Sequence, residues 1–573
     1  MKKIAMLTVK GAVGLLPKTV KEKLKSNYKL TEFYSRSLQR SGLFYGFPSK
    51  KKRMAQYNRY LASQKKRIAN ELPTHIPRAM IQCVVVGNNK LDVTREALRK
   101  AGVVDAQVFI ISPNIKSGKN CFTNFQEAIT NLDCDYPVLF LNSGDTVHDD
   151  VVSLLALKTD TADILYCDTD RFGKKGKLES PHFLPDWNYD FQLSAAYIFT
   201  GVVFKTSVLK QVKVDNIRTI SGLVAITAVN QKVLDIRHLP YTLVHRGEGV
   251  SIEERLGDIA NVVQSNTKAE VHFSKSVKVN ELAWPAEGTP LVSLIIPTKN
   301  GKDLVKACIE SIVNKSTYQN YEILLIDNGS TETESLKFFA SLKTQSKIRV
   351  LNYPGPFNYS AINNFGVKHA KGNVIGLVNN DIEVISPLWL DYMVGHALRE
   401  DIGCVGAKLL YSDGRIQHAG VVLGYGGGAG HAHKYFPRYH PGYLNRLAAT
   451  QNYSAVTAAC LLVRKSLFEE VGGLNEKDLA VAFNDVDFCL RIRELGKRNV
   501  YCAEAELFHH ESVSRGLDIA PEKAARFNRE LAYLQNRWAN VIAHDPAYSP
   551  NLTLRSENFA IKEEREYISS SDS

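Results

Sequence analysis

A cluster of amides and carboxylates follows one of the most apolar stretches of the chain. The run at residues 374–378 ends abruptly at Asn379, Asn380 and Asp381, and Glu383 comes two positions later. Mg²⁺ and Mn²⁺ prefer oxygen ligands and are often shared with a diphosphate. Asp381, supported by Asn380 and Glu383, is therefore a candidate metal ligand. The alternative is an ordinary polar turn, because Asn and Asp favour turns.

Further acids stand where a strand pattern ends or a helix pattern begins. Asp327 lies at the polar end of the strand pattern at residues 321–330, where it could accept hydrogen bonds from a base or ribose, or cap a helix. Asp485 and Asp487 precede an amphipathic helical pattern, and an acid is stabilised there by the helix dipole. One cap does not need two acids, however. A carboxylate held within hydrogen-bonding reach of a hydroxyl can remove its proton.

Histidines gather at two places. His509 and His510 follow an apolar strand pattern, and such a pair could ligate a metal or contact a phosphate. Residues 424–433 form a glycine-rich segment, GYGGGAGHAH, and no GKS or GKT follows it, so it is not a phosphate-binding loop. We expect a flexible loop over a cleft, with His431 and His433 beside the substrate.

Alternating strand and helix patterns must position these residues. Apolar strand patterns occupy residues 291–298, 321–330, 348–353 and 373–378, and helical patterns occupy residues 303–315, 334–342 and 362–370. Such alternation is typical of a mostly parallel sheet with both faces covered. Ligands of these sheets bind at the carboxyl ends of the strands. Asp327 and Asp381 both fall at such ends, which favours a site over a turn.

The first half of the chain resembles the second half in outline. Its strand patterns at residues 80–89, 106–114 and 136–147 parallel those just described, and residues 199–209 parallel residues 457–468. We therefore expect two related α/β domains. The predicted boundaries are residues 1–74 for a basic arm, 75–280 for the first domain, 290–520 for the second, and 521–573 for a C-terminal helix and tail.

Positive charge is concentrated at the N-terminus. Residues 1–67 contain 18 Lys or Arg and two acids and so carry +16, whereas the whole chain of 573 residues carries +13. Lysines alternate there with aliphatic and aromatic residues. That pattern suits an interfacial helix on an anionic membrane surface better than a tail that binds nucleic acid, and a solvated arm is the alternative.

Other signals concern the cellular compartment. Lys10 interrupts the apolar core that a signal peptide would need, and the apolar runs are far shorter than the ~20 residues of a transmembrane helix. Nine scattered cysteines without a CxxC pair argue against a disulfide framework and fit a reducing compartment. We therefore expect a cytoplasmic protein at the inner face of the membrane.

An ordered series of motifs resembles one enzyme family. The motifs run from residue 291 to residue 516 and include PTKNG, LLIDNGS, PGPFNYSAINN, LVNNDIEV, GHAHKYFPR, AFNDVDFCLRIRELG and FHHESVSRG. They resemble the family 2 inverting glycosyltransferases, and in particular a two-domain bacterial subgroup of O-antigen and polysaccharide synthesis. The resemblance implies tandem GT-A-like, Rossmann-like domains of the α/β class.

The resemblance also implies roles for individual residues. Asp485 corresponds to the catalytic base, and Asp381 to the final acid of a metal-binding motif in which Asn379 replaces the first acid. His510, or else His509, corresponds to a late histidine that ligates the metal or contacts the diphosphate. The implied donor-binding residues are Pro297, Thr298, Asp327, Asn379 and Asn380. The implied acceptor-binding residues are Gly472, Gly473, Asn475, Asp487 and His433.

The first copy departs from this pattern. It has no acid at the position of Asp327, only Asp145 at the metal position, and no acid in residues 221–233, which correspond to the segment of Asp485. We therefore expect a degenerate domain that does not transfer sugar and instead binds the acceptor glycan, a partner enzyme or its neighbouring domain.

The resemblance predicts a metal-dependent, inverting transfer of a sugar from a UDP- or dTDP-linked donor. The acceptor would be a glycan or a lipid-linked glycan in the synthesis of bacterial O-antigen or capsule, with Mg²⁺ or Mn²⁺ as cofactor. A homo-oligomer or a partner biosynthetic enzyme is compatible with the sequence, and nucleic acid is not an expected partner. Two alternatives are a bifunctional polymerase that uses both domains and a non-catalytic glycan-binding scaffold.

Overall fold

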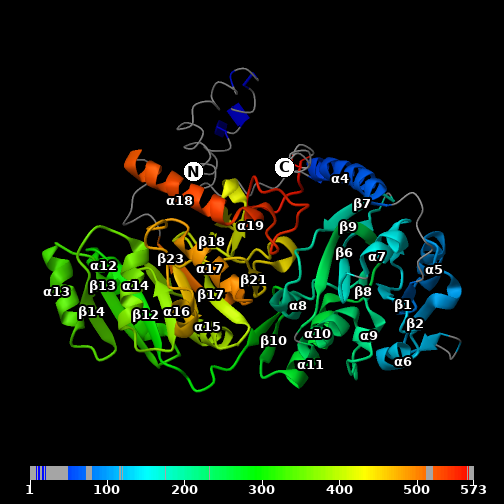
Figure 1. Ribbon diagram of the computed structural model, residues 1–573, viewed down its shortest axis with the longest axis horizontal. Coiled ribbons are helices and arrows are strands. Elements are labelled where there is room, and N and C mark those ends of the chain that lie inside the picture. The colour runs from blue at the N-terminus through cyan, green and yellow to red at the C-terminus, as the bar shows by residue number, and fades with distance from the viewer. Residues whose placement is uncertain are drawn as a thin grey trace.

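The computed structural model describes residues 50–72, 81–563 and 566, except for residues 115–117, 119, 160, 175, 232 and 511–520. Within the first 49 residues it describes only residues 8, 9, 11, 12, 16, 17 and 20, so most of the predicted basic arm lies outside the described residues. Figure 1 shows two α/β domains side by side, with α18 lying over the second domain and α4 over the first.

The first domain is built on a mixed sheet. Its strands are β1 (Gln82–Val86), β2 (Val108–Ile111), β3 (Cys121–Phe122), β4 (Val138–Asn142), β5 (Thr146–Val147), β6 (Ile164–Phe172), β7 (Leu178–His182), β8 (Val202–Phe204) and β9 (Ile236–Arg246). Its helices are α5 (Leu91–Lys100), α6 (Phe125–Thr130), α7 (Val151–Thr159), α8 (Tyr189–Ala195), α9 (Thr206–Leu209), α10 (Ile220–Asn230) and α11 (Ile252–Asn266). A hairpin, β10 (Glu270–Ser274) and β11 (Val279–Ala283), ends the domain.

The second domain repeats this plan. Its strands are β12 (Val292–Thr298), β13 (Tyr321–Asp327), β14 (Ile348–Asn352), β15 (Val374–Val378), β16 (Ile382–Val384), β17 (Ile402–Leu410), β18 (Ile416–His418), β19 (Val421–Leu423), β20 (Ala429–His431), β21 (Gln451–Tyr453), β22 (Cys460–Arg464) and β23 (Arg498–His509). Its helices are α12 (Lys302–Lys315), α13 (Thr333–Leu342), α14 (Tyr359–His369), α15 (Trp389–Ala397), α16 (Lys465–Glu470), α17 (Asn484–Glu494), α18 (Pro521–Arg537) and α19 (Ala539–Ala543).

The two sheets have the same topology. The strand order is β3-β2-β1-β4-β8-β6-β9-β5 in the first and β14-β13-β12-β15-β22-β17-β23-β16 in the second. Equivalent pairs also run in the same sense: β4 and β8 pair antiparallel, as do β15 and β22. The central strands β12, β13 and β15 are buried along their whole length, as expected for parallel strands covered on both faces. The prediction of two tandem α/β domains from the internal repeat is confirmed.

Helix α4 (Lys50–Glu71) is docked on the body of the protein, although it falls within the predicted arm of residues 1–74. Tyr57, Tyr60 and Ile68 are each 1% exposed. Gln64 donates a hydrogen bond to the Thr242 carbonyl oxygen and accepts one from its amide. Because the apolar side of α4 is occupied in this way, only its basic side is available to another surface.

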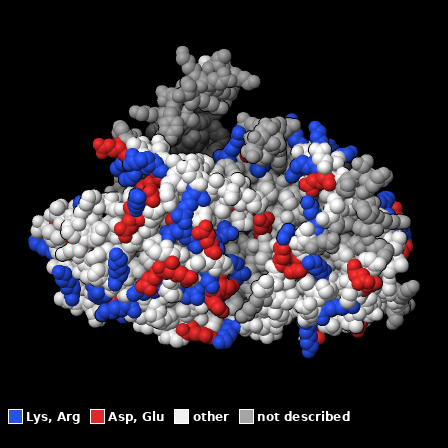
Figure 2. Space-filling model, in the orientation of Figure 1, with Lys and Arg blue, Asp and Glu red and all other residues white. Residues whose placement is uncertain are grey.

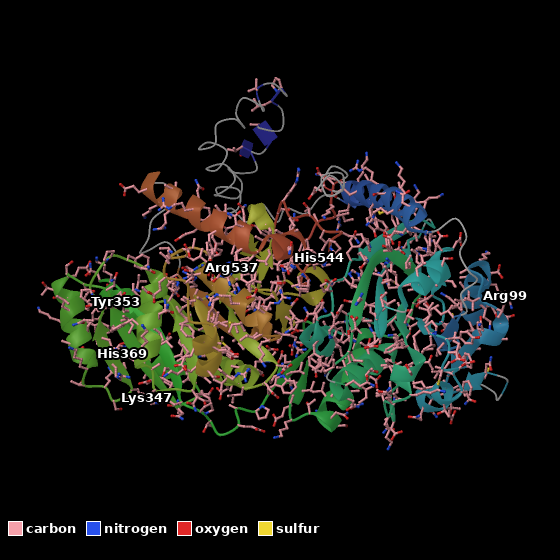
Figure 3. The ribbon with its side chains drawn as sticks, in the orientation of Figure 1. Arg99, Lys347, Tyr353, His369, Arg537 and His544 are labelled. Carbon is pink, nitrogen blue, oxygen red and sulfur yellow. The ribbon has the colours of Figure 1, made fainter. Side chains whose placement is uncertain are left out.

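The C-terminal tail links the two domains. Asp545 accepts a hydrogen bond of 2.7 Å from the Leu423 amide in the second domain, and Asn551 donates one of 2.8 Å to Asp168 in the first. His544 contacts Asp186 of the first domain at 2.9 Å, and Figure 3 shows His544 where the tail crosses between the domains. The tail is therefore a structural part of both domains.

A buried polar cluster joins the domains directly. Arg399 donates to Asp190 at 2.6 Å, and Asn452 donates to the other carboxylate oxygen at 2.7 Å. The Asn188 side chain also donates to the Asn452 carbonyl oxygen and accepts from the Asn452 amide. Burial alone would raise the pKa of the Asp190 carboxyl, but the Arg399 guanidinium holds it well below its usual range. Such interlocked contacts favour a fixed arrangement of the two domains.

Several elements agree closely with their sequence patterns. The helical pattern at residues 303–315 forms α12, the pattern before residue 298 forms β12, and the pattern at residues 362–370 forms most of α14. Asp485 lies in the first turn of α17. Among the described residues, no helix has the length and apolar character required to cross a bilayer. The predicted domain boundaries remain predictions.

Candidate active site

A cavity of about 390 Å³ opens in the second domain. It lies between the carboxyl end of β15, the N-terminus of α17, the glycine-rich segment and α18. Its lining residues are Tyr359, Asn379, Gln417, Val421, Ala429, Gly430, His431, Lys434, Thr457, Ala458, Ala459, Val481, Ala482, Phe483, Asn484, Asp485, Val486, His509, Arg526 and Phe527. Four of the sequence candidates, Asn379, His431, Asp485 and His509, therefore share one cavity.

Asp485 presents a carboxylate to this cavity from the first turn of α17. The helix begins after Phe483, whose φ of 58° is in the left-handed region, so the chain turns sharply just before the acid. One carboxylate oxygen accepts a hydrogen bond from the Ala458 amide at 3.1 Å. Burial raises the pKa of the Asp485 carboxyl, which makes its ionised form a better proton acceptor than an exposed aspartate.

Asp381 lies beside His509 at the edge of the same region. The register of β16 and β23 pairs Ile382 with His509, which brings His509 Nε2 to 3.2 Å from Asp381 Oδ1. His509 Nδ1 is 2.6 Å from the side-chain oxygen of Gln417. Because that oxygen can only accept, Nδ1 carries the proton in the neutral ring, and Nε2 accepts from the Asn379 side-chain amide at 3.1 Å.

The resemblance implies His510, or else His509, as the histidine beside the metal, and the structure places His510 away from the Asp381 carboxylate. Its Nε2 is 3.1 Å from a carboxylate oxygen of Glu383, and its Nδ1 is 2.7 Å from the Ser412 hydroxyl. Successive side chains of a strand point to opposite faces, so only one histidine of the pair can face Asp381. The residue that faces Asp381 is His509.

The donor-side candidates gather at the carboxyl ends of β12 and β13. Thr298 pairs in register with Asp327, which is 6% exposed. Asp327 Oδ1 accepts hydrogen bonds from the Ser330 amide at 2.9 Å and the Ser330 hydroxyl at 2.6 Å. Asn380 donates to the Thr298 hydroxyl at 3.0 Å. Pro297 precedes this group on β12. Of the donor-side residues, Asn379 alone lines the cavity, and Pro297, Thr298, Asp327 and Asn380 lie outside its lining.

Two of the predicted acceptor-binding residues are engaged in packing instead. His433 is fully buried, its ring stacks on Phe559 at 4.1 Å, and its Nε2 accepts from the Tyr443 amide. Asp487 is also fully buried and binds Arg491 at 2.8 Å and the indole Trp538 Nε1 at 3.0 Å. Neither lines the cavity, so the assignment of His433 and Asp487 to the acceptor is not supported by their positions.

The remaining acceptor-side candidates form a turn next to the site. Gly472 and Gly473 have φ values of 76° and 72°, and Arg491 donates to the Gly473 carbonyl oxygen at 2.7 Å. A Cβ on Gly473 would lie 2.6 Å from the Asn364 side-chain oxygen, which explains a glycine there. Asn475 accepts from the Asp478 amide. None of these three residues lines the cavity.

Comparison with known proteins identifies the second domain. Residues 293–472 match the family described as Glycosyl transferase family 2. The chain contains a family 2 glycosyl transferase domain. The family predicted from the sequence is thus confirmed. Asp485 and His509 lie beyond the matched residues of this glycosyl transferase domain.

Longer relatives cover both domains. The chain is 41% identical over 456 residues to the uncharacterized protein y4gI of Sinorhizobium fredii, covering 75% of this chain and 50% of the relative. It is 33% identical over 448 residues to the O-antigen biosynthesis protein RfbC of Myxococcus xanthus, covering 74% of this chain and 34% of the relative. The chain thus spans half the length of the first and about a third of the second.

A solved glycosyltransferase structure also matches. The mannosyltransferase PcManGT of Pyrobaculum calidifontis, solved with GDP-Man and Mn²⁺, is 15% identical, with a TM-score of 0.35 and coverage of 46% of this chain and 71% of that one. This similarity is too low to support an argument about the present chain.

The glycosyl transferase domain offers few protein ligands for a cation. In the part of the chain that the structure describes, no group of three or more His, Cys, Asp and Glu side chains is placed to hold a metal ion. Asp381 Oδ1 and His509 Nε2 nevertheless lie 3.2 Å apart. Mg²⁺ is commonly held by one or two side chains together with water and phosphate oxygens. The residues fit such a shared site and do not fit a closed protein cage.

The equivalent acid of the first domain is engaged within its own domain. Asp145 is 1% exposed and accepts hydrogen bonds from the Thr200 hydroxyl, the Gly247 amide and the Asn142 amide. Burial raises the pKa of its carboxyl to about 6. The counterpart of His509 is His245, which pairs with Thr146 in register and contacts Asp170 at 2.6 Å. These contacts are consistent with a structural role for the acid.

Residues of the site that sequence patterns missed come from distant segments. Tyr359, Gln417 and Lys434 line the cavity, and so do Arg526 and Phe527 of α18. Tyr359 stands in the PGPFNYSAINN motif, and Lys434 follows the glycine-rich segment, so both were near recognised motifs. For α18 the sequence predicts a C-terminal helix, and it leaves open whether this helix covers the active site or makes a dimer contact.

Proposed function

We propose that this protein transfers a sugar from a nucleoside-diphosphate sugar to a glycan acceptor in the synthesis of a bacterial surface polysaccharide, with inversion at the anomeric carbon. The observation that carries the proposal is the placement of Asp485 and His509 on the wall of one cavity, with Asp381 3.2 Å from His509. The family match and the similarity to an O-antigen biosynthesis protein support the same class of reaction.

In this mechanism the donor lies across the carboxyl ends of β12, β13 and β15. Asp327 and Thr298 hold the nucleoside, and Asn379 and Asn380 lie beside the diphosphate. The acceptor hydroxyl enters the cavity near Asp485, which removes its proton as the oxygen attacks the anomeric carbon. The attack comes from the face opposite the leaving diphosphate, so the configuration inverts.

Asp381 and His509 are the proposed protein ligands of a divalent cation, Mg²⁺ or Mn²⁺. A bound cation would supply positive charge against the charge that develops on the departing diphosphate. Gln417 contributes by holding the His509 tautomer, since its side-chain oxygen accepts from Nδ1. Lys434 and Arg526 add positive charge to the cavity wall.

The first domain, in this proposal, is non-catalytic and supports the second through the buried contacts between them. The alternative of a bifunctional polymerase has less support, because Asp145 is fully engaged by its neighbours. The alternative of a scaffold without catalysis has less support, because Asp485 lines a cavity and burial raises its pKa.

Contact with an anionic membrane surface is part of the proposal. Lys51, Lys52, Arg53, Arg59 and Lys65 lie on the exposed side of α4, and Figure 2 shows basic residues at the upper edge of the molecule, where α4 and α18 lie. Flotation with anionic vesicles is expected for the whole chain and weakened by removing residues 1–49, which leaves α4 docked. Equal flotation with neutral vesicles would contradict an electrostatic contact.

Nucleotide binding tests the proposal. A ligand that binds only the folded protein raises the thermal midpoint. UDP, dTDP and GDP are each compared with and without Mn²⁺, and one of them is expected to give a shift that requires Mn²⁺. Asp381→Ala and His509→Ala should remove the Mn²⁺-dependent part of the shift in thermal midpoint, whereas His510→Ala should retain most of that shift. An equal loss in both histidine variants would contradict the assignment of His509.

A further inference from the structure

Helix α18 contacts the two loops that form the walls of the cavity. Gln535 donates to the Gly427 carbonyl oxygen at 2.7 Å, on the glycine-rich segment. A Cβ on Gly428 would lie 2.7 Å from Leu531, so the helix and this segment are in close contact. On the other wall, the Phe527 ring lies 5.3 Å from that of Phe483, just before Asp485.

Glu530 makes the most specific of these contacts. Its carboxylate is buried, with the residue 2% exposed, and its two oxygens accept from the successive amides of Val481 and Ala482 at 3.0 and 2.9 Å. Arg526, one turn earlier, lies 3.8 Å from the same carboxylate and balances its charge. A charged acceptor on two successive, partly buried amides is a strong restraint, because charge-assisted hydrogen bonds are about twice as strong as neutral ones.

The restrained segment leads directly to the candidate base. Val481 and Ala482 are followed by Phe483, which has a positive φ of 58°, then by Asn484 and Asp485. A bulky residue in this conformation persists only where its surroundings enforce it. A second contact restrains the chain on the C-terminal side of Asp485. Trp538, directly after α18, donates to Asp487 at 3.0 Å, and Figure 3 shows Arg537 at this end of the helix.

We propose that Glu530 is a positioning residue for Asp485, and that α18 is thereby a working part of the active site. This inference rests on the proposed function of Asp485. The inference goes beyond that proposed function because it assigns a role to α18, which lies outside the residues 293–472 that match the family. Loss of the Glu530 carboxylate leaves the amides of Val481 and Ala482 without this acceptor, so the loop relaxes and Asp485 shifts. A displacement of about 1 Å can reduce turnover about 10²-fold.

The test compares Glu530→Gln and Glu530→Ala with Glu522→Gln, an exposed acid on the same helix. Hydrogen exchange on the full chain should show faster exchange at residues 481–486 in both Glu530 variants and no change in the control. This measurement does not depend on catalysis. Unchanged exchange in Glu530→Ala would overturn the proposal.

Kinetics provide the second readout. Turnover should fall roughly 10-fold in Glu530→Gln and 10²-fold in Glu530→Ala, with nucleotide affinity unchanged. Because burial raises the Asp485 pKa, a looser loop should lower it and move the acidic limb of the kcat/KM profile to lower pH. Faster exchange with unchanged kcat and an unmoved limb would also overturn the positioning role. A wild-type protein that turns over no nucleotide sugar would instead contradict the proposed function, while the exchange result would still decide whether Glu530 orders the loop.

Discussion

Asp485→Asn is expected to lower kcat about 10³-fold while leaving nucleotide binding within twofold of the wild type. Asparagine has nearly the same shape and can still accept from the Ala458 amide, so the loop should keep its structure. It cannot accept the proton of an acceptor hydroxyl, and general base catalysis contributes about 10²–10⁴-fold. Release of nucleoside diphosphate gives the rate, and calorimetry gives the affinity.

The pH profile sharpens this prediction. Wild-type kcat/KM should rise with pH through the pKa of Asp485, which burial places above the ordinary aspartate value, and this limb should be absent in Asp485→Asn. The matched control is Asp92→Asn, since Asp92 is an exposed acid in the first turn of α5. Turnover in Asp485→Asn equal to that of the control would contradict the assignment of the base.

Arg399→Ala is expected to destabilise the protein by about 3–5 kcal/mol, because it leaves a buried carboxylate without its cation. Asp190 and Arg399 are 3% and 9% exposed at their side chains, and their contact joins the two domains. The effect should be measured by urea unfolding. The matched control is Arg237→Ala, whose partner Asp235 lies on the surface, and it should produce no measurable change.

The same pair predicts a pH dependence. The folded-state pKa of Asp190 is depressed, so its stabilising contribution is present above the unfolded aspartate pKa of about 3.9 and is lost as pH falls through the folded value. In Arg399→Ala the pKa of Asp190 rises. The stability difference between the two proteins should therefore shrink below about pH 4. A difference that stays constant into acid would show that the pair is not the source of the stability.

The sequence was sufficient for the fold because its strongest signals are local. The fully apolar strands β12, β13 and β15 cannot be mistaken for exposed strands, and the repeat predicts a second copy of their arrangement. Asp327 and Asp381 were found because each closes such a strand. These inferences need only the spacing of apolar residues along each element and the rule that ligands bind at the carboxyl ends of parallel strands.

The rest depends on tertiary contacts. Which of His509 and His510 faces Asp381 depends on the register of β16 with β23, and a pattern of two adjacent histidines does not contain that register. Asp487 has the sequence features of a site residue, but its carboxylate accepts a hydrogen bond from the indole of Trp538, 51 positions later. His433 belongs to a loop with a glycine-rich signal, yet Phe559 of the tail covers it. In each case the partner is far away in sequence.

The most direct test is to incubate the wild-type protein with Mn²⁺ and a panel of nucleotide sugars, with a glycan acceptor, and to follow the anomeric proton by NMR. We expect one donor to be consumed, the released nucleoside diphosphate to accumulate with it, and the product to carry the anomeric configuration opposite to that of the donor. Retention of configuration would contradict direct attack assisted by Asp485. The absence of consumption with every donor would contradict the proposal that this cavity transfers sugars.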